Sequence, residues 1–172
     1  MILISNPDKS QWQEILKRPV MNTENLFDTV RSVIDRVKEE GDRAVLDYEE
    51  KFDKVALTAL AVTEAEQAEA SVGEELKKAI RLAKRNIETF HAAQRFESKR
   101  VETQPGVTCW QKAVAIEKVG LYIPGGTAPL FSTVLMLAVP ARIAGCKEIV
   151  LCTPPGRDGK VHPAVLFAAK VA

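Results

Sequence analysis

The chain of 172 residues is 46% hydrophobic and 27% charged, and its formal net charge at pH 7 is +1. This composition is typical of a soluble globular protein with one ordinary domain, or one and a half small ones. It gives no general reason to expect a nucleic acid or a membrane as partner, because basic and acidic residues are interspersed and because the longest apolar run, residues 134–139, is too short to span a bilayer.

The cysteines and the first residues bear on the cellular compartment. Cys109, Cys146 and Cys152 form an odd set without a C-x-x-C pair, which predicts free thiols in a reducing cytoplasm. The first residues lack both the basic region and the long apolar region of a secretory signal. We therefore expect a cytoplasmic protein.

Residues 1–20 are expected to form an amino-terminal arm. Asp8 or Ser10 can cap a helical turn that carries Trp12, and Pro19 breaks this turn. A tryptophan with few local partners favours docking elsewhere, and a contact with a second subunit is one interpretation.

Residues 21–118 are expected to form a mainly helical region. From about residue 22, apolar residues recur at three- and four-residue spacing, which predicts an amphipathic helix that Gly41 closes. A second helix follows directly. Residues 59–62 are a candidate short strand.

Two capping boxes predict where the next helices start. Thr63-x-x-Glu66 opens an alanine-rich helix, and Ser71-x-x-Glu74 is a second candidate. The long helix that follows should run to about Arg95 or Phe96. Its basic side chains alternate with acidic ones, so they favour a solvated face over a nucleic-acid stripe.

The pattern then changes from helical to alternating. Residues 101–103 and 107–111 flank the turn sequence Gln104-Pro105-Gly106. A Pro-Gly turn between alternating segments predicts a β-hairpin near residues 101–111.

Residues 119–172 predict one βαβ unit. An apolar strand up to Ile123, an apolar helix that ends at Gly145, and a second apolar strand up to Cys152 follow one another along the chain. Pro163 then fits the first turn of another helix. This order of elements begins a doubly wound sheet.

Two parallel strands cannot cover their own faces. We therefore expect an α/β protein in which a helical amino-terminal region is followed by the first βαβ unit of an incomplete Rossmann-like, doubly wound parallel sheet. On this interpretation residues 119–172 are the truncated start of a Rossmann-like domain, and further strands follow residue 172 in a longer protein.

The connection after the first strand is the strongest candidate for a binding site. Pro124 ends the strand, and Gly125 and Gly126 allow positive φ and a close approach of a ligand to the backbone. Ser132 or Thr133 can cap the next helix, whose unpaired N–H groups would attract an anion such as phosphate. The alternative is a tight βα connection whose glycines only relieve crowding, because the G-x-G-x-x-G spacing of a dinucleotide fingerprint is absent.

Several short motifs occur in a fixed order along the chain. They are Gly41-Asp42, Lys51-Phe-Asp53, Asn86-Ile-Glu-Thr-Phe-His91, Thr103-Gln-Pro-Gly106, Gly120-Leu-Tyr-Ile-Pro-Gly-Gly126, Ala128-Pro-Leu-Phe-Ser-Thr-Val134 and Ala144-Gly-Cys146. Together they resemble the histidinol dehydrogenase family, and the resemblance runs from about residue 22 to the last residue.

The resemblance implies a zinc-requiring, NAD-dependent enzyme of histidine biosynthesis that oxidises L-histidinol to L-histidine through the aldehyde. It also implies a homodimer and an NAD-binding domain that begins at residues 119–172, with Tyr122, Gly125 and Gly126 at the cofactor. The family's zinc ligands and acid–base pair lie beyond residue 172. We therefore expect no catalytic or metal-binding residue in this chain, and no dehydrogenase activity from it alone.

The remaining reactive side chains have simpler explanations. His91 fits a helix end and His162 a surface turn, and no cysteine is spaced to form a zinc site with either. The three cysteines are interpreted as buried thiols without a catalytic role. The alternative function for the chain is a non-catalytic dimerisation module or a nucleotide-binding module.

Overall fold

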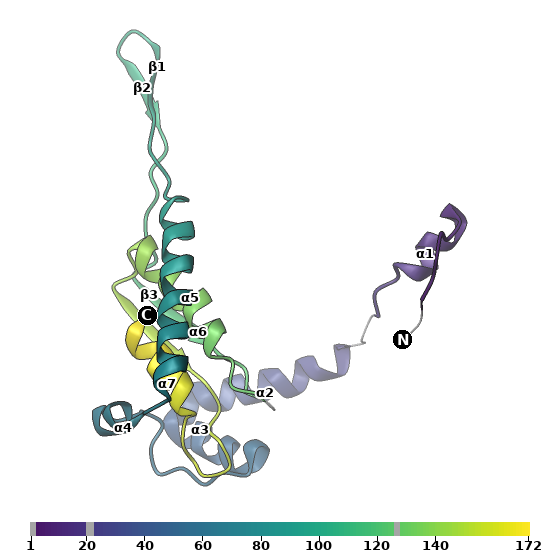
Figure 1. Ribbon diagram of the computed structural model, residues 1–172, viewed down its shortest axis with the longest axis vertical. Helices are drawn as coiled ribbons and strands as arrows, with labels where there is room; N and C mark the ends of the chain where they lie inside the picture. Colours follow the sequence, from purple (N-terminus) through teal and green to yellow (C-terminus); the bar gives the residue numbers. More distant parts are fainter. Residues whose placement is uncertain (1–2, 20–22, 126–127) are drawn as a thin grey trace. The chain divides into compact units, whose positions relative to one another are not determined.

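The computed structural model describes residues 3–19, 23–125 and 128–172. These residues form two compact units, divided between Ala44 and Val45. The division falls within helix α3 (Asp42–Tyr48). Figure 1 follows the helices and strands of both units along the sequence.

The first unit is built from helical segments. Asp8 caps a 3-10 turn, η1 (Lys9–Gln11), through a capping box, so the predicted cap at Asp8 is confirmed. Helices α1 (Trp12–Ile15) and α2 (Glu24–Glu40) follow. Gly41 ends α2 with a φ of 61°, in agreement with the prediction.

The second unit begins with further helices. After α3, one π-helical turn, η2 (Glu49–Asp53), leads toward α4 (Glu64–Glu69) and α5 (Glu74–Ala92). The Thr63 capping box is confirmed, because the Thr63 hydroxyl accepts a hydrogen bond from the Glu66 N–H at 3.2 Å while the Glu66 carboxylate accepts one from the Thr63 N–H at 2.8 Å.

Three local predictions in this region are wrong. Residues 59–62 form no strand, because an isolated apolar segment becomes one only when a neighbour pairs with it. Gly73 is the N-cap of α5 and has an extended backbone, so Ser71 lies outside the helix start and no side chain caps it. The helix ends at Ala92, before the predicted end at Arg95 or Phe96.

A β-hairpin follows α5, as predicted. Strands β1 (Arg100–Gln104) and β2 (Val107–Trp110) pair in antiparallel register, and Gly106 turns the chain with a φ of 83°. All residues of both strands are exposed. The Arg100 guanidinium lies 5.1 Å from the centre of the Trp110 ring, which is a cation–π contact across the two strands.

The predicted βαβ unit is confirmed. Strands β3 (Lys118–Tyr122) and β4 (Glu148–Cys152) are parallel, and residues 118–122 pair in order with residues 148–152. Helix α6 (Phe131–Ala144) connects the two strands, and α7 (Pro163–Val171) follows β4. Pro163 occupies the first position of α7, and Gly145 closes α6 with a φ of 91°, both in agreement with the sequence.

The predicted cap of α6 is wrong. The helix begins at Phe131, so Ser132 and Thr133 lie inside its first turn, and the N-cap Leu130 makes no side-chain hydrogen bond. The Thr133 N–H donates to the Leu130 carbonyl at 3.0 Å. Phe131 packs against the hydrophobic core, and this packing explains why the helix starts earlier than the hydroxyl residues suggest.

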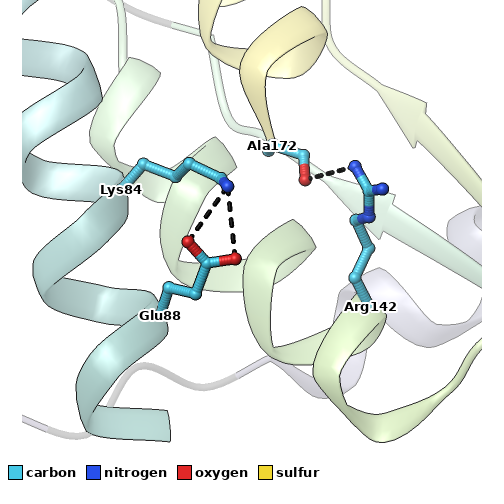
Figure 2. A network of polar contacts seen from close by, with 4 residues as sticks. All are labelled: Lys84, Glu88, Arg142 and Ala172. Atoms are coloured by element: carbon cyan, nitrogen blue, oxygen red, sulfur yellow. Dashed lines mark hydrogen bonds and ion pairs between the residues drawn. The ribbon is translucent and has the colours of Figure 1, made fainter. Parts of the chain in front are cut away.

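Helices α5, α6 and α7 pack around one hydrophobic core, which also takes in one face of the β3–β4 pair. Its largest fully buried side chains are Ile80, Ile123, Val134 and Leu135. Polar contacts border this core (Figure 2): Lys84 pairs with Glu88 along α5, and the Arg142 guanidinium donates to the Ala172 carbonyl at 2.8 Å.

The opposite face of the β3–β4 pair is open among the residues that the structure describes. Tyr122 is 63% exposed, Val150 is 52% exposed, and Cys152 is exposed beside them. The strands are therefore half-buried on alternate residues, although their continuous apolar sequences predict burial on both faces. Within the same residues, no helix has the length and apolar character needed to cross a membrane.

Candidate functional site

A cleft of about 460 Å³ lies where the chain leaves the carboxyl ends of β3 and β4. Residues 123–125 and 128–130 line one wall, and residues 153–156 and 158, with residues 160–163, line the other. In open parallel sheets, ligands bind in crevices beyond the carboxyl ends of the strands. The cleft therefore has the position expected of a binding site in this fold class.

The first wall is anchored in the core through Ile123. The Ile123 side chain is 0% exposed, and its backbone N–H donates to the Cys152 carbonyl at 2.8 Å. This hydrogen bond extends the parallel ladder one residue past the strand ends. Pro124 and Gly125 therefore leave the sheet from a fixed point.

The structure brings one predicted site residue, Gly125, into the cleft. Gly125 is not among the described residues with positive φ, but a Cβ on it would lie 2.7 Å from Cγ of Pro154. Close packing against Pro154 therefore accounts for a glycine here, which is the crowding explanation that the sequence left open. Gly126 lies outside the described residues.

Tyr122, the other predicted cofactor residue, has a different environment. It is the last residue of β3, and in the strand register it lies opposite Cys152. Its side chain belongs to the open face of the sheet and does not line the cleft. Tyr122 and Gly125 are thus close in the chain, but only Gly125 lines the cleft.

The second wall supplies the polar side chains Thr153, Asp158, Lys160 and His162. The loop holds its own shape, because the Gly156 N–H donates to the Lys160 carbonyl at 2.8 Å and the Lys160 N–H donates to the Asp158 carboxylate at 3.1 Å. The sequence motifs place none of these four side chains in a site. The available signal was its place directly after a parallel strand, where ligand sites gather.

His162 has a structural role at the edge of the cleft. Its Nδ1 accepts a hydrogen bond from the Ala164 N–H at 3.1 Å, which makes His162 the N-cap of α7. The surface-turn interpretation missed this cap. Pro163 was the signal, because proline at the first helical position leaves the preceding residue as the N-cap.

Two side chains of opposite charge, Lys160 and Asp158, line the cleft. The pKa of Glu66 is lowered from its ordinary value, first because the Thr63 backbone N–H donates to the carboxylate, then because the Thr63 hydroxyl also donates, and to a smaller extent by the charge of Lys160. Among the described residues that line the cleft, Lys160 is the one with a lysine or arginine side chain. Lys160 can pair with an anionic group of a ligand, while Asp158 gives the same wall a charge of opposite sign.

The described residues contain no group of three or more His, Cys, Asp or Glu side chains placed to hold a metal ion. His91 lies in the last turn of α5, edge-on to Phe90, so its assignment to a helix end is confirmed. The cysteines differ from the prediction, because Cys109 and Cys152 are exposed and only Cys146 is half-buried. Both exposed cysteines lie on strands whose outward faces are uncovered among the described residues.

Comparisons with known proteins give one consistent family. The family model described as histidinol dehydrogenase matches residues 16–172. The chain is 74% identical over 174 aligned positions to histidinol dehydrogenase of Bacteroides fragilis, covering 100% of the chain and 41% of that protein. It is 50% identical over 164 positions to histidinol dehydrogenase of Escherichia coli strain K12, covering 94% of the chain and 37% of that protein.

The fold agrees with a solved structure. A crystal structure of histidinol dehydrogenase from Elizabethkingia anophelis matches with a TM-score of 0.91 and 48% sequence identity, covering 96% of the chain and 39% of that protein. The chain thus spans about two fifths of the length of these relatives.

Proposed function

The chain belongs to the histidinol dehydrogenase family, and on this basis we propose that it forms one wall of the NAD site in an enzyme of histidine biosynthesis. The proposed reaction is the zinc- and NAD-dependent oxidation of L-histidinol to L-histidine through L-histidinaldehyde. It is proposed for the complete protein, because the chain spans 41% of the Bacteroides fragilis relative.

The cleft beyond β3 and β4 is the observation that supports this proposal most directly. Its volume of about 460 Å³ suits part of a dinucleotide, and Lys160 provides a positive charge for a pyrophosphate. When bound, NAD accepts a hydride at its nicotinamide ring. The residues of this chain would hold the cofactor and exclude water, with Gly125 on one side and the loop before α7 on the other.

Zinc does not fit the described residues, because no suitable cluster of ligands occurs among them. We therefore assign no catalytic step to these side chains and expect the chain alone to be inactive. The test is to mix the purified chain with histidinol, NAD and zinc and to follow NADH absorbance. Turnover above a blank without protein would contradict this expectation.

NADH titration tests the proposed cofactor site. Lys160→Ala in the cleft and Tyr122→Ala on the open face of the sheet, where the family resemblance implies a cofactor contact, are each expected to weaken NADH binding by about fivefold to thirtyfold, since each removes one contact worth about 1–2 kcal/mol. Lys112→Ala is the matched control, because Lys112 is exposed and outside the cleft. Equal affinity in all four proteins, or no NADH binding by the unmodified protein, would refute the proposed site.

We also propose that the complete protein is a cytoplasmic homodimer that the amino-terminal arm helps to join. Exposed apolar side chains in the arm support this arrangement, namely Leu3, Ile4, Trp12, Ile15 and Leu16. Sedimentation of the complete protein with and without the Trp12→Ala substitution is the test. An unchanged dimer affinity would exclude Trp12 from the subunit contact.

A further inference from the structure

The two walls of the cleft meet at Gly125 and Pro154. A Cβ built on Gly125 would lie 2.7 Å from Cγ, 3.3 Å from Cβ and 3.5 Å from Cδ of Pro154. Carbon atoms of non-bonded groups are normally about 3.5–4.0 Å apart. The pyrrolidine ring therefore occupies the space that any larger residue at position 125 would need.

Neither side of this contact can move away easily. Ile123, two residues before Gly125, is fully buried and its N–H donates to the Cys152 carbonyl, two residues before Pro154. Both segments thus leave neighbouring strands directly after a shared hydrogen bond. Proline also fixes its own φ, so the ring has a defined direction.

We propose that Pro154 is a positioning residue for the glycine turn. Its ring sets the distance between the turn after β3 and the loop after β4, and this distance defines the width of the cleft. Position 125 must then be a glycine, because a side chain there would overlap the Pro154 ring. The inference rests on the proposed function for the identity of the ligand, a nicotinamide dinucleotide, and on the positions of Gly125 and Pro154 for the contact itself.

A double-mutant cycle on the complete product of the gene that encodes this chain tests the inference, with NADH as the probe. Gly125→Ala alone forces the turn away from the ring and is expected to weaken NADH binding by about tenfold or more. In a Pro154→Ala background, Cγ and Cδ of the ring are absent, and the same Gly125→Ala change should cost less than about threefold.

The adjacent proline provides the matched control. Pro155 also lines the cleft, but the three atoms nearest to a Cβ at Gly125 all belong to Pro154. In a Pro155→Ala background, Gly125→Ala should keep its full effect of about tenfold. Rescue by Pro154→Ala but not by Pro155→Ala supports positioning through the ring. Equal effects of Gly125→Ala in all three backgrounds would overturn the inference.

A second readout separates this inference from the proposed function. The same cycle is measured by thermal unfolding without nucleotide, where Gly125→Ala should lower the midpoint unless Pro154 is also alanine. If the unmodified protein binds no NADH, the proposed function fails, and the thermal cycle alone decides the positioning role. Additive midpoint shifts would then reject it.

Discussion

Truncation of Ile123 to alanine tests whether the cleft is anchored in the core. Ile123 is 0% exposed and lies between β3 and the glycine turn. The substitution removes Cγ1, Cγ2 and Cδ1, which costs about 2.4 kcal/mol in transfer free energy at about 0.8 kcal/mol per carbon. The cavity left behind adds to this cost, so we expect a total of about 3–4 kcal/mol in the free energy of unfolding.

Ile116→Ala is the matched control for this substitution. Ile116 is 67% exposed, so only about a third of the transfer term applies, or about 0.8 kcal/mol, and solvent fills the vacated space. Ile116 lies shortly before β3 and Ile123 directly follows it, and both changes remove the same atoms. The expected difference between the two variants is therefore about 2–3 kcal/mol.

Urea denaturation followed by far-ultraviolet circular dichroism measures this difference. With a slope of about 1–3 kcal/mol per molar urea, the Ile123→Ala midpoint should fall about 0.7–3 M below that of Ile116→Ala. The slopes should agree if both variants unfold in the same way. Equal midpoints would refute the reasoning that the turn is held by a fully buried side chain.

Two further predictions concern carboxyl groups. The pKa of Glu66 is held below its ordinary value of 4.5 by the Thr63 N–H and hydroxyl. The stability that this capping box contributes is therefore present above pH 4.5 and is lost as the pH falls through the lowered pKa. Thr63→Val should shift the NMR-monitored pKa of Glu66 upward, and an unchanged pKa would contradict the capping role. The pKa of Glu49 is raised from 4.5, mainly by burial and then by the charge of Asp53, and Glu49 Oε2 has no hydrogen-bond partner among the described residues. Glu49→Gln should therefore raise the thermal unfolding midpoint at pH 7, and this gain should vanish below pH 4.5. A lower midpoint at pH 7 would show that the Glu49 charge is stabilised in the folded protein.

The elements that the sequence predicted best have local causes. The Pro-Gly turn before Val107, the capping box at Thr63 and the glycine after α6 each act within a few residues. The predictions that failed depend on distant partners. Residues 59–62 have strand-like composition but no neighbouring strand, and Phe131 joins α6 because it packs on a core assembled from three helices.

The candidate site likewise contains one residue with a local sequence signal and other contacts that depend on distant partners. Gly125 was found because a glycine after a buried strand is visible in one stretch of sequence. Its contact with Pro154 depends on the parallel register, which places Tyr122 opposite Cys152 and so brings the two loops together. Neither Lys160 nor Pro154 has a local pattern that indicates this proximity, and only the pairing of the strands creates it.

The N-terminal cap of α7 is an imidazole ring at the border of the cleft. Because Nδ1 of His162 accepts the Ala164 N–H, the proton of the neutral ring resides on Nε2. A residue without a side-chain acceptor at position 162 would leave the Ala164 N–H without this partner in the first turn of the helix. The shape of this wall therefore depends on a single hydrogen bond between the backbone of α7 and the ring.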